Sequence, residues 1–273
     1  MWIELQSLAA RLSLLDDTRF AAVCDELLIQ TAVRGGIDRV HLAINLATKE
    51  PDGGIDGRCT DAPRTHGRLF PRPNSVYQFK SGNFSRSAES LAKHDILEKP
   101  RVMAAAKAGH AVTFLIARDR GDEFEAQVLA EARKLNVPVE EGQLNILTGV
   151  TLATLIQPIP ALAASVLELE MHLLRFEDWA GGEPFRNPYQ TDTKLEARLA
   201  ELRSMLQIPR ARVRIVGSPG NGKTRTVLEA IRGSDLEAIT LYAHQPQDVP
   251  GQLLQYLRNT PDAICLLVVD EVD

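Results

Sequence analysis

Apolar residues recur at helical spacing near the start of the chain. Within residues 14–33 the positions that share one helix face are Phe20, Val23, Cys24, Leu27, Leu28 and Thr31. Intervals of three and four residues are typical of an amphipathic helix. We therefore predict a helix here, capped by Asp16 or Asp17 and ended by the Gly35-Gly36 pair.

The next hundred and more residues alternate between two kinds of hydrophobic pattern. Strand-like patterns occupy residues 38–47, 55–59, 76–80, 111–117 and, briefly, 137–139. Helix-like patterns occupy residues 89–108, 121–135 and a final stretch from 151. Strands that alternate with helices of this length predict an α/β domain.

A change of pattern suggests a domain boundary. The interval from about 175 to 191, around the sequence FEDWAGGEPFRNPYQTD (176–192), is rich in Gly, Pro, Asn and Asp and follows no period. The 273 residues also suggest two domains. We predict a first domain at 1–172, a linker at 173–191 and a second domain at 192–273, in which a helix ends before Pro209 and a strand covers 213–217.

Composition narrows the function classes. The formal net charge of -5 excludes a globally basic nucleic-acid-binding protein, so DNA would have to contact a local patch. The three cysteines form no CxxC pair and indicate neither a disulfide framework nor a zinc site. The chain has no basic, apolar leader and no stretch long enough to span a membrane, so we expect a cytoplasmic protein without a membrane partner.

The most specific motif is a glycine-rich loop between the predicted strand at 213–217 and a helix. It reads Gly217, Ser218, Pro219, Gly220, Asn221, Gly222, Lys223 and Thr224. Glycines let consecutive backbone N–H groups approach phosphate oxygens. We predict that the loop binds a nucleotide, with Lys223 on the β- and γ-phosphates and the Thr224 hydroxyl on Mg²⁺.

A second motif follows at 266–271, where the apolar run LLVV precedes Asp270 and Glu271. Asp270, at the end of a buried strand, would hold Mg²⁺, and Glu271 would polarise the attacking water. The predicted ligands of this domain are Mg²⁺ and ATP, with GTP left open.

Both motifs resemble P-loop NTPases of the AAA+ and STAND classes, and GKTRTVLEAI is similar to the second class in particular. The resemblance covers about residues 180–273. It implies that the two motif-bearing strands are separated in the sheet by the strand that follows the second motif. No such strand follows here, so we expect a piece of a longer protein with exposed, aggregation-prone strand edges.

A separate group of polar residues occurs in the first domain. The turn PDGGIDG contains Asp56, and the strand VYQFK contains Gln78 and Lys80. Strand alternation puts Gln78 and Lys80 on one face, and a hairpin would bring Asp56 beside them. Asp56 and the Gln78 oxygen could hold Mg²⁺ while Lys80 orients water, which suits phosphodiester hydrolysis.

These residues resemble the Mrr-like branch of the restriction-endonuclease-like superfamily, over about residues 15–165. The resemblance implies a mixed sheet flanked by helices, Asp56, Gln78 and Lys80 as the catalytic residues, and double-stranded DNA as the substrate. Relatives often carry a glutamate on the first helix. The matching position here is Ala21, and the nearest acids are Asp17 and Asp25.

The loop between the two halves of this group is basic. It carries Arg58, Arg64, Arg68 and Arg72 against a single acid, Asp61. Arginines beside the metal site could bind DNA phosphates, which supply affinity without sequence information. An ordinary solvated surface loop is the alternative.

The combination of the two predicted domains resembles the antiviral STAND defence proteins of bacteria. This resemblance implies a DNA endonuclease effector joined to an NTPase switch, homo-oligomerisation on activation, and a phage-derived trigger sensed beyond residue 273. One alternative is a modification-dependent restriction enzyme with NTP-driven translocation. Another is a non-cleaving DNA-binding or scaffold domain of a signalling ATPase.

Overall fold

The computed structural model describes residues 3–44, 54–82, 84–121, 123–140, 142–168, 172–185, 188–218 and 220–270. The chain divides into two compact units. The N-terminal unit comprises Ile3–Pro158 and Leu162–Leu167. The C-terminal unit comprises Ile159–Ala161 and the chain from Glu168 onward. Each unit is described by itself.

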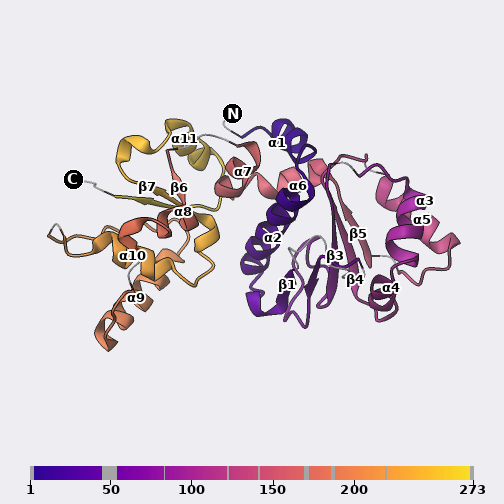
Figure 1. Ribbon diagram of the computed structural model, residues 1–273, viewed down its shortest axis with the longest axis horizontal. Coiled ribbons are helices and arrows are strands. Elements are labelled where there is room, and N and C mark those ends of the chain that lie inside the picture. Colours follow the sequence, from indigo (N-terminus) through magenta and orange to yellow (C-terminus); the bar gives the residue numbers. More distant parts are fainter. Residues whose placement is uncertain are drawn as a thin grey trace. The chain divides into compact units, whose positions relative to one another are not determined.

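The N-terminal unit is built on a five-stranded sheet (Figure 1). Its strands are β1 (Leu42–Ile44), β2 (Gly57–Cys59), β3 (Ser75–Lys80), β4 (Ala111–Ile116) and β5 (Leu144–Leu147), in spatial order β1-β2-β3-β4-β5. The β1–β2 and β2–β3 pairs are antiparallel, whereas β3–β4 and β4–β5 are parallel. This mixed sheet with flanking helices confirms the α/β prediction.

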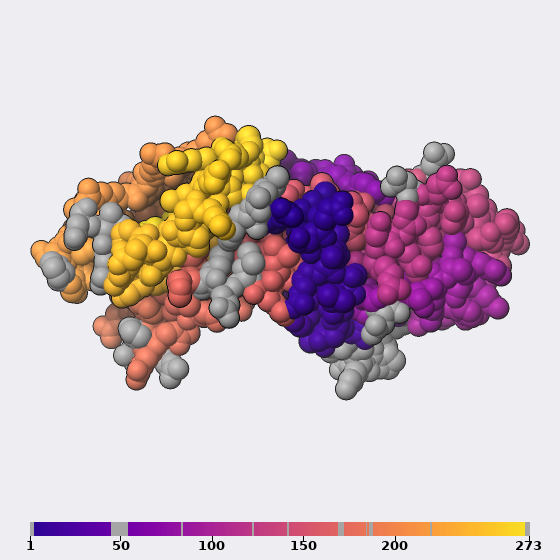
Figure 2. All heavy atoms as spheres, turned by 90° about the horizontal axis from the view of Figure 1, so that it is seen from above, coloured from indigo at the N-terminus to yellow at the C-terminus, as the bar shows by residue number. Residues whose placement is uncertain are grey.

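Helices cover both faces of this sheet. The helices in this part of the chain are α1 (Leu5–Leu12), α2 (Asp17–Arg34), η1 (Arg39–His41), α3 (Ala88–Leu91), the π-helical turn η2 (Ala92–Leu97), α4 (Pro100–Lys107), α5 (Phe124–Lys134), α6 (Gly149–Ile156) and α7 (Pro160–Leu167). The first two residues of α7 belong to the C-terminal unit. Figure 1 shows α2 on one side of the sheet and α3 and α5 on the other. Helix α1 packs on α6, and the two form adjacent surface in the space-filling view (Figure 2).

The predicted first helix is confirmed as α2. Its N-cap is Asp16, whose Oδ1 accepts a hydrogen bond of 2.8 Å from the Arg19 N–H, and Asp17 is the first helical residue. Phe20, Cys24 and Leu28 are almost completely buried, as the helical spacing required.

Three predicted segments of the N-terminal unit differ in the structure. The helix expected at 89–108 is divided into α3, η2 and α4, because Pro100 cannot continue a helix and starts a new one. The strand expected at 137–139 is wrong. Those residues form no strand, and the neighbour of β4 is β5, whose short sequence LNIL gave no clear period. Of the strand expected at 38–47, residues 42–44 form β1, and 45–47 lie outside the described residues.

The C-terminal unit contains a three-stranded sheet in the order β6-β7-β8. Its elements are β6 (Leu174–Arg175), α8 (Phe176–Ala180), η3 (Glu183–Phe185), α9 (Thr193–Leu206), α10 (Lys223–Ile231), η4 (Glu237–Ile239), β7 (Thr240–Ala243), η5 (Pro246–Asp248), α11 (Gly251–Asn259) and β8 (Leu266–Val269). Strand β6 runs antiparallel to β7, and β7 runs parallel to β8. None of the helices in the described ranges combines the length and apolar character of a membrane span.

Two predictions for the second half are corrected. The interval 173–191, expected as a linker, contributes β6 and α8, and Trp179 of α8 is buried in the core of the C-terminal unit. Burial of its aromatic side chains in this core favours a folded segment, although its Gly and Pro residues suggested a loop. The strand expected at 213–217 is not formed: residues 211–218 pair with none of the described strands, and Val216 is 81% exposed.

The close approach of two segments at Gly82 gives a first prediction. A methyl group at Gly82, just after β3, would lie 1.7 Å from the carbonyl oxygen of Ser13. Backbone must move to relieve this overlap, so Gly82→Ala should destabilise the protein by about 1–3 kcal/mol. Thermal unfolding followed by circular dichroism should show a midpoint lower by several degrees.

The matched control is Gly251→Ala at the start of α11, where nothing lies within 4 Å of the added methyl. This variant should unfold at or above the parent's midpoint, since alanine is the better helix former. Equal midpoints for the two variants would contradict the packing at Gly82.

Candidate functional sites

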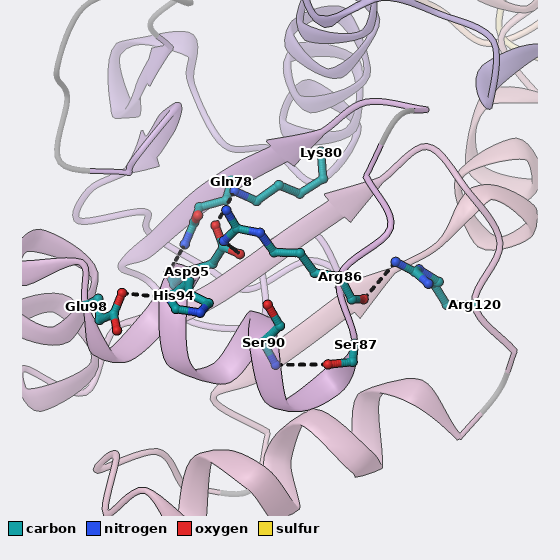
Figure 3. Close-up of polar contacts among 9 residues, drawn as sticks. All are labelled: Gln78, Lys80, Arg86, Ser87, Ser90, His94, Asp95, Glu98 and Arg120. Carbon is teal, nitrogen blue, oxygen red and sulfur yellow. Dashed lines mark hydrogen bonds and ion pairs between the residues drawn. The ribbon is translucent and has the colours of Figure 1, made fainter.

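Two of the predicted catalytic side chains meet on one face at the carboxyl end of β3 (Figure 3). Gln78 Nε2 donates a 2.7 Å hydrogen bond to the main-chain oxygen of Asp95. Lys80 Nζ donates to the Asp95 carboxylate, with 2.8 Å between Nζ and Oδ1. The strand alternation predicted this shared face, and both side chains point toward η2.

Asp95, which no sequence motif indicated, lies at the centre of this cluster. Its side chain is only 4% exposed, and Arg86 Nη1 binds its second carboxylate oxygen at 2.7 Å. Two cations thus face one buried carboxylate, which is how a protein keeps a buried charge from costing several kcal/mol. A signal existed in the sequence, because Asp95 follows Leu91 by one helical turn and so occupies a core position.

The third predicted residue, Asp56, lies at the edge of the same strand. Its N–H donates to the Tyr77 carbonyl at 2.9 Å, and its Oδ2 accepts from the Phe79 N–H at 2.6 Å. Phe79 stands between Gln78 and Lys80 in β3. Asp56 is therefore bonded to the main chain of the same strand end that carries Gln78 and Lys80.

Two side chains at this strand end carry oxygen atoms of the kind that a hard cation binds. Gln78 Oε1 is buried and has no hydrogen-bond partner in the described part of the chain, while its Nε2 is held by Asp95. An amide oxygen and the Asp56 carboxylate are oxygen ligands of the kind Mg²⁺ prefers. Among the described residues, no group of three or more His, Cys, Asp or Glu side chains could hold a metal. A metal here would thus rely on few protein ligands.

Helix α2 brings a further acid to this neighbourhood. The pKa of the Cys24 thiol is raised well above its ordinary value, mainly by burial and further by the negative charges of Asp56 and Asp25. Both carboxylates are therefore close enough to Cys24 to act on it. The pKa of Asp25 is itself raised by burial, against the opposite effect of Arg39. Of the two acids that the sequence offered on this helix, Asp25 follows the buried Cys24 directly, whereas Asp17 is exposed at the helix start.

The segment after Lys80 is held by a second arginine. Arg120 Nη2 donates to the carbonyl oxygens of Phe84 and Arg86, at 3.2 and 2.8 Å, and its guanidinium stacks on the Phe84 and Phe124 rings. The pKa of Arg120 is lowered, chiefly by burial and further by Arg118. This arrangement fixes the main chain that carries Arg86, a cation the sequence analysis did not single out.

The basic loop divides into two pairs. Arg58 and Arg64 are exposed, whereas Arg68 and Arg72 bind groups within the unit. Arg68 pairs with Glu125 and donates to the Ile146 carbonyl at 3.1 Å. Arg72 donates to the Gly109 carbonyl at 2.7 Å. Since Gly109 lies just before β4, Arg72 is at the opposite strand end from Lys80. This corrects the expectation that the whole loop lies beside the predicted metal ligands.

The glycine-rich loop leads into α10, which begins at Lys223. Gly220 and Gly222 have φ values of 78° and 71°, a left-handed conformation that glycine adopts readily. Lys223 Nζ donates to the carbonyl oxygens of Gly217 and Ser218, at 2.9 and 3.2 Å. The lysine therefore lies over its own loop. Pro219 of the predicted motif is outside the described residues.

The two predicted Mg²⁺ ligands of the C-terminal unit are in direct contact. Thr224 Oγ1 donates to Asp270 Oδ2 at 2.7 Å, which joins the start of α10 to the end of β8. Tyr242, which the sequence analysis did not consider, donates its hydroxyl to the same oxygen at 3.0 Å. A hydroxyl and a carboxylate side by side fit a magnesium ion. Glu271, the predicted general base, lies outside the described residues.

Comparisons with family models, curated proteins and solved structures gave no match for this chain. The assignment of both sites therefore depends on the residues themselves.

The buried carboxylate gives the second prediction. In Asp95→Asn the main-chain bond to Gln78 can persist, but Lys80, which is 19% exposed, loses its counter-charge. Breaking one side of a buried ion pair typically costs 3–5 kcal/mol. We expect the free energy of unfolding, measured by urea denaturation with circular dichroism, to fall by about 3 kcal/mol.

Arg86→Ala serves as the control, because Arg86 is 44% exposed and leaves Asp95 paired with Lys80. Its cost should be about 1 kcal/mol or less. The buried-charge interpretation fails if the two variants lose the same stability.

Proposed function

We propose that the chain couples a Mg²⁺-dependent DNA endonuclease in its N-terminal unit to a nucleoside triphosphate switch in its C-terminal unit. The observation that supports the nuclease proposal is that Gln78 and Lys80 share one face at the end of β3, where the Asp56 carboxylate binds the main chain between them. The substrate is double-stranded DNA, and the nucleotide is ATP or GTP. The NTPase unit controls assembly of several copies, and assembly controls cleavage.

In this proposal Asp56 and the Oε1 atom of Gln78 hold the magnesium ion. When bound, the ion would polarise the scissile phosphate and favour ionisation of water. Lys80 orients the attacking water and offsets the negative charge that develops on the phosphate. Its ammonium group has three N–H donors, and one of them on Asp95 limits how far the side chain can swing.

The nucleotide proposal is supported by the contact between Thr224 and Asp270. The backbone N–H groups of the loop and the Lys223 ammonium bind the phosphates, and Lys223 leaves the carbonyl oxygens of Gly217 and Ser218 to do so. Thr224 and Asp270 hold Mg²⁺, and Glu271 acts as the general base for hydrolysis.

A second candidate function is favoured by the Lys80–Asp95 ion pair. A lysine neutralised by a buried carboxylate is also what a non-cleaving DNA-binding or scaffold domain would contain. The two candidates differ in whether Lys80 is needed for strand cleavage.

For the nuclease we predict that the full chain cuts supercoiled and linear duplex DNA with Mg²⁺ but not with EDTA, at least when joined to an oligomerising tag. Lys80→Ala should lower the cleavage rate roughly a hundredfold, as removal of a donor to a developing charge does.

Lys107→Ala is the matched control, because this exposed lysine ends α4 and takes no part in the site. It should cleave at the parent's rate. Intact DNA in every folded, tagged preparation would contradict the nuclease and favour the scaffold candidate.

For the nucleotide site we predict that Lys223→Ala lowers the affinity for ATP with Mg²⁺ roughly ten- to hundredfold. This is the loss expected when hydrogen bonds to a charged group are removed. Isothermal titration calorimetry of the full chain measures the effect.

Lys194→Ala, an exposed lysine at the start of α9, is the control and should bind like the parent. Equal ATP affinities of the Lys223→Ala and Lys194→Ala chains would contradict the proposal that the loop binds phosphate.

A further inference from the structure

Tyr242 links the Asp270 carboxylate to a part of the C-terminal unit that carries no nucleotide motif. Its hydroxyl donates to Asp270 Oδ2 at 3.0 Å, and the same oxygen accepts from Thr224 at 2.7 Å. Strand pairing fixes this geometry, because Tyr242 of β7 is in register with Val268 of β8 and the Asp270 N–H donates to the Ala243 carbonyl at 2.9 Å. The contact is therefore part of the sheet framework.

The ring of Tyr242 is stacked on Trp179 of α8. The ring centroids are 4.4 Å apart and the planes differ by only 8°. Trp179 is 2% exposed and also makes edge contacts with Phe176 and Phe185 at 6.1 and 6.2 Å. An interior packed this closely has little space for a ring to move alone. A displacement of Tyr242 must therefore change the surroundings of Trp179.

We propose that Tyr242 is a positioning residue that orients Asp270 for Mg²⁺ and passes the state of the nucleotide site to Trp179 and α8. This inference rests on the nucleotide-binding function proposed above. It adds a residue, Tyr242, and a path of contacts from Asp270 to Trp179 that neither the glycine-rich loop nor the motif at 266–271 contains.

The expected effect of Tyr242 on Mg²⁺ affinity follows from the way proteins orient carboxylates that bind metals. Hydrogen-bond partners behind such a ligand typically account for ten- to a hundredfold of the metal affinity. Tyr242 suits this role because its ring is rigid and mostly buried, so its hydroxyl has a nearly fixed position. The hydroxyl also lies 3.4 Å from His244 Nδ1, which gives it a second partner when Asp270 turns toward a cation.

The route ends near the beginning of the C-terminal unit. Helix α8 follows β6 directly, and β6 pairs with β7 at Leu174 and Tyr242. These elements come shortly after Leu162–Leu167, the last segment of the N-terminal unit. The route therefore ends in β6 and α8, two elements of the C-terminal unit.

The experiment uses the full chain with Trp2→Phe, which leaves Trp179 as the sole tryptophan. Calorimetry measures ATP affinity with Mg²⁺ and with EDTA, and tryptophan emission is recorded during the same titrations. Mg²⁺ with ATP should change the emission of Trp179. Tyr242→Phe keeps the stacked ring but removes the hydroxyl.

In the Tyr242→Phe chain we expect unchanged ATP affinity in EDTA, a roughly tenfold weaker gain in affinity from Mg²⁺, and loss of the Mg²⁺-dependent emission change. Tyr256→Phe is the matched control, because Tyr256 of α11 is a second mostly buried tyrosine, 5% exposed, in the same unit. It should retain both the Mg²⁺ gain and the emission change.

A Tyr242→Phe chain with the full Mg²⁺ gain and emission change would overturn the inference while leaving nucleotide binding intact. Absence of ATP binding by the Trp2→Phe parent itself would instead refute the proposed nucleotide function, and the inference with it. The two failures are therefore distinguishable.

Discussion

The parallel pairing of β3 with β4 is the constraint on which the N-terminal unit depends. Six residue pairs, from Ser75 with Ala111 to Lys80 with Ile116, fix the register. Every residue of β4 is buried, so helices must cover both faces of the sheet. Side chains alternate between these faces. Each polar side chain of β3 therefore lies between the sheet and a layer of helices, where it needs a hydrogen-bond partner.

Those partners come from η2, the turn that packs over the end of β3. Gln78 is 1% exposed and Asp95 is 3% exposed, in surroundings that include Val76 and Ile96. Unpaired polar groups in such a place cost about 1–3 kcal/mol each, and unpaired charges cost more. The amide of Gln78 and the ammonium of Lys80 both use Asp95, which leaves Oε1 of Gln78 as the buried polar atom without a hydrogen bond.

Sequence patterns predicted what depends on local spacing. They gave the α/β class, the helix α2 with a cap at Asp16 or Asp17, and the shared face of Gln78 and Lys80. They failed where tertiary packing decides. Residues 137–139 and 144–147 are both short apolar runs, and the sequence does not show which of them pairs with β4. The structure pairs β4 with 144–147, which is β5. The interval at 173–191 was predicted as a linker because its many Gly and Pro residues interrupt any hydrophobic period. Trp179, within this interval, is nevertheless a core residue.

Both sites also contain a residue that no motif reveals, and the cause is the same in each. A carboxylate that is to hold a position near a strand end needs donors from neighbouring elements. Asp95 obtains them from β3 and from Arg86, while Asp270 obtains them from Thr224 and Tyr242. Motifs list residues that would meet a ligand, whereas these supporting contacts depend on which elements become neighbours. Because Tyr242 is itself stacked on Trp179, its support for Asp270 depends on how α8 packs. The Asp270 carboxylate is thus connected through Tyr242 to the aromatic core of its unit.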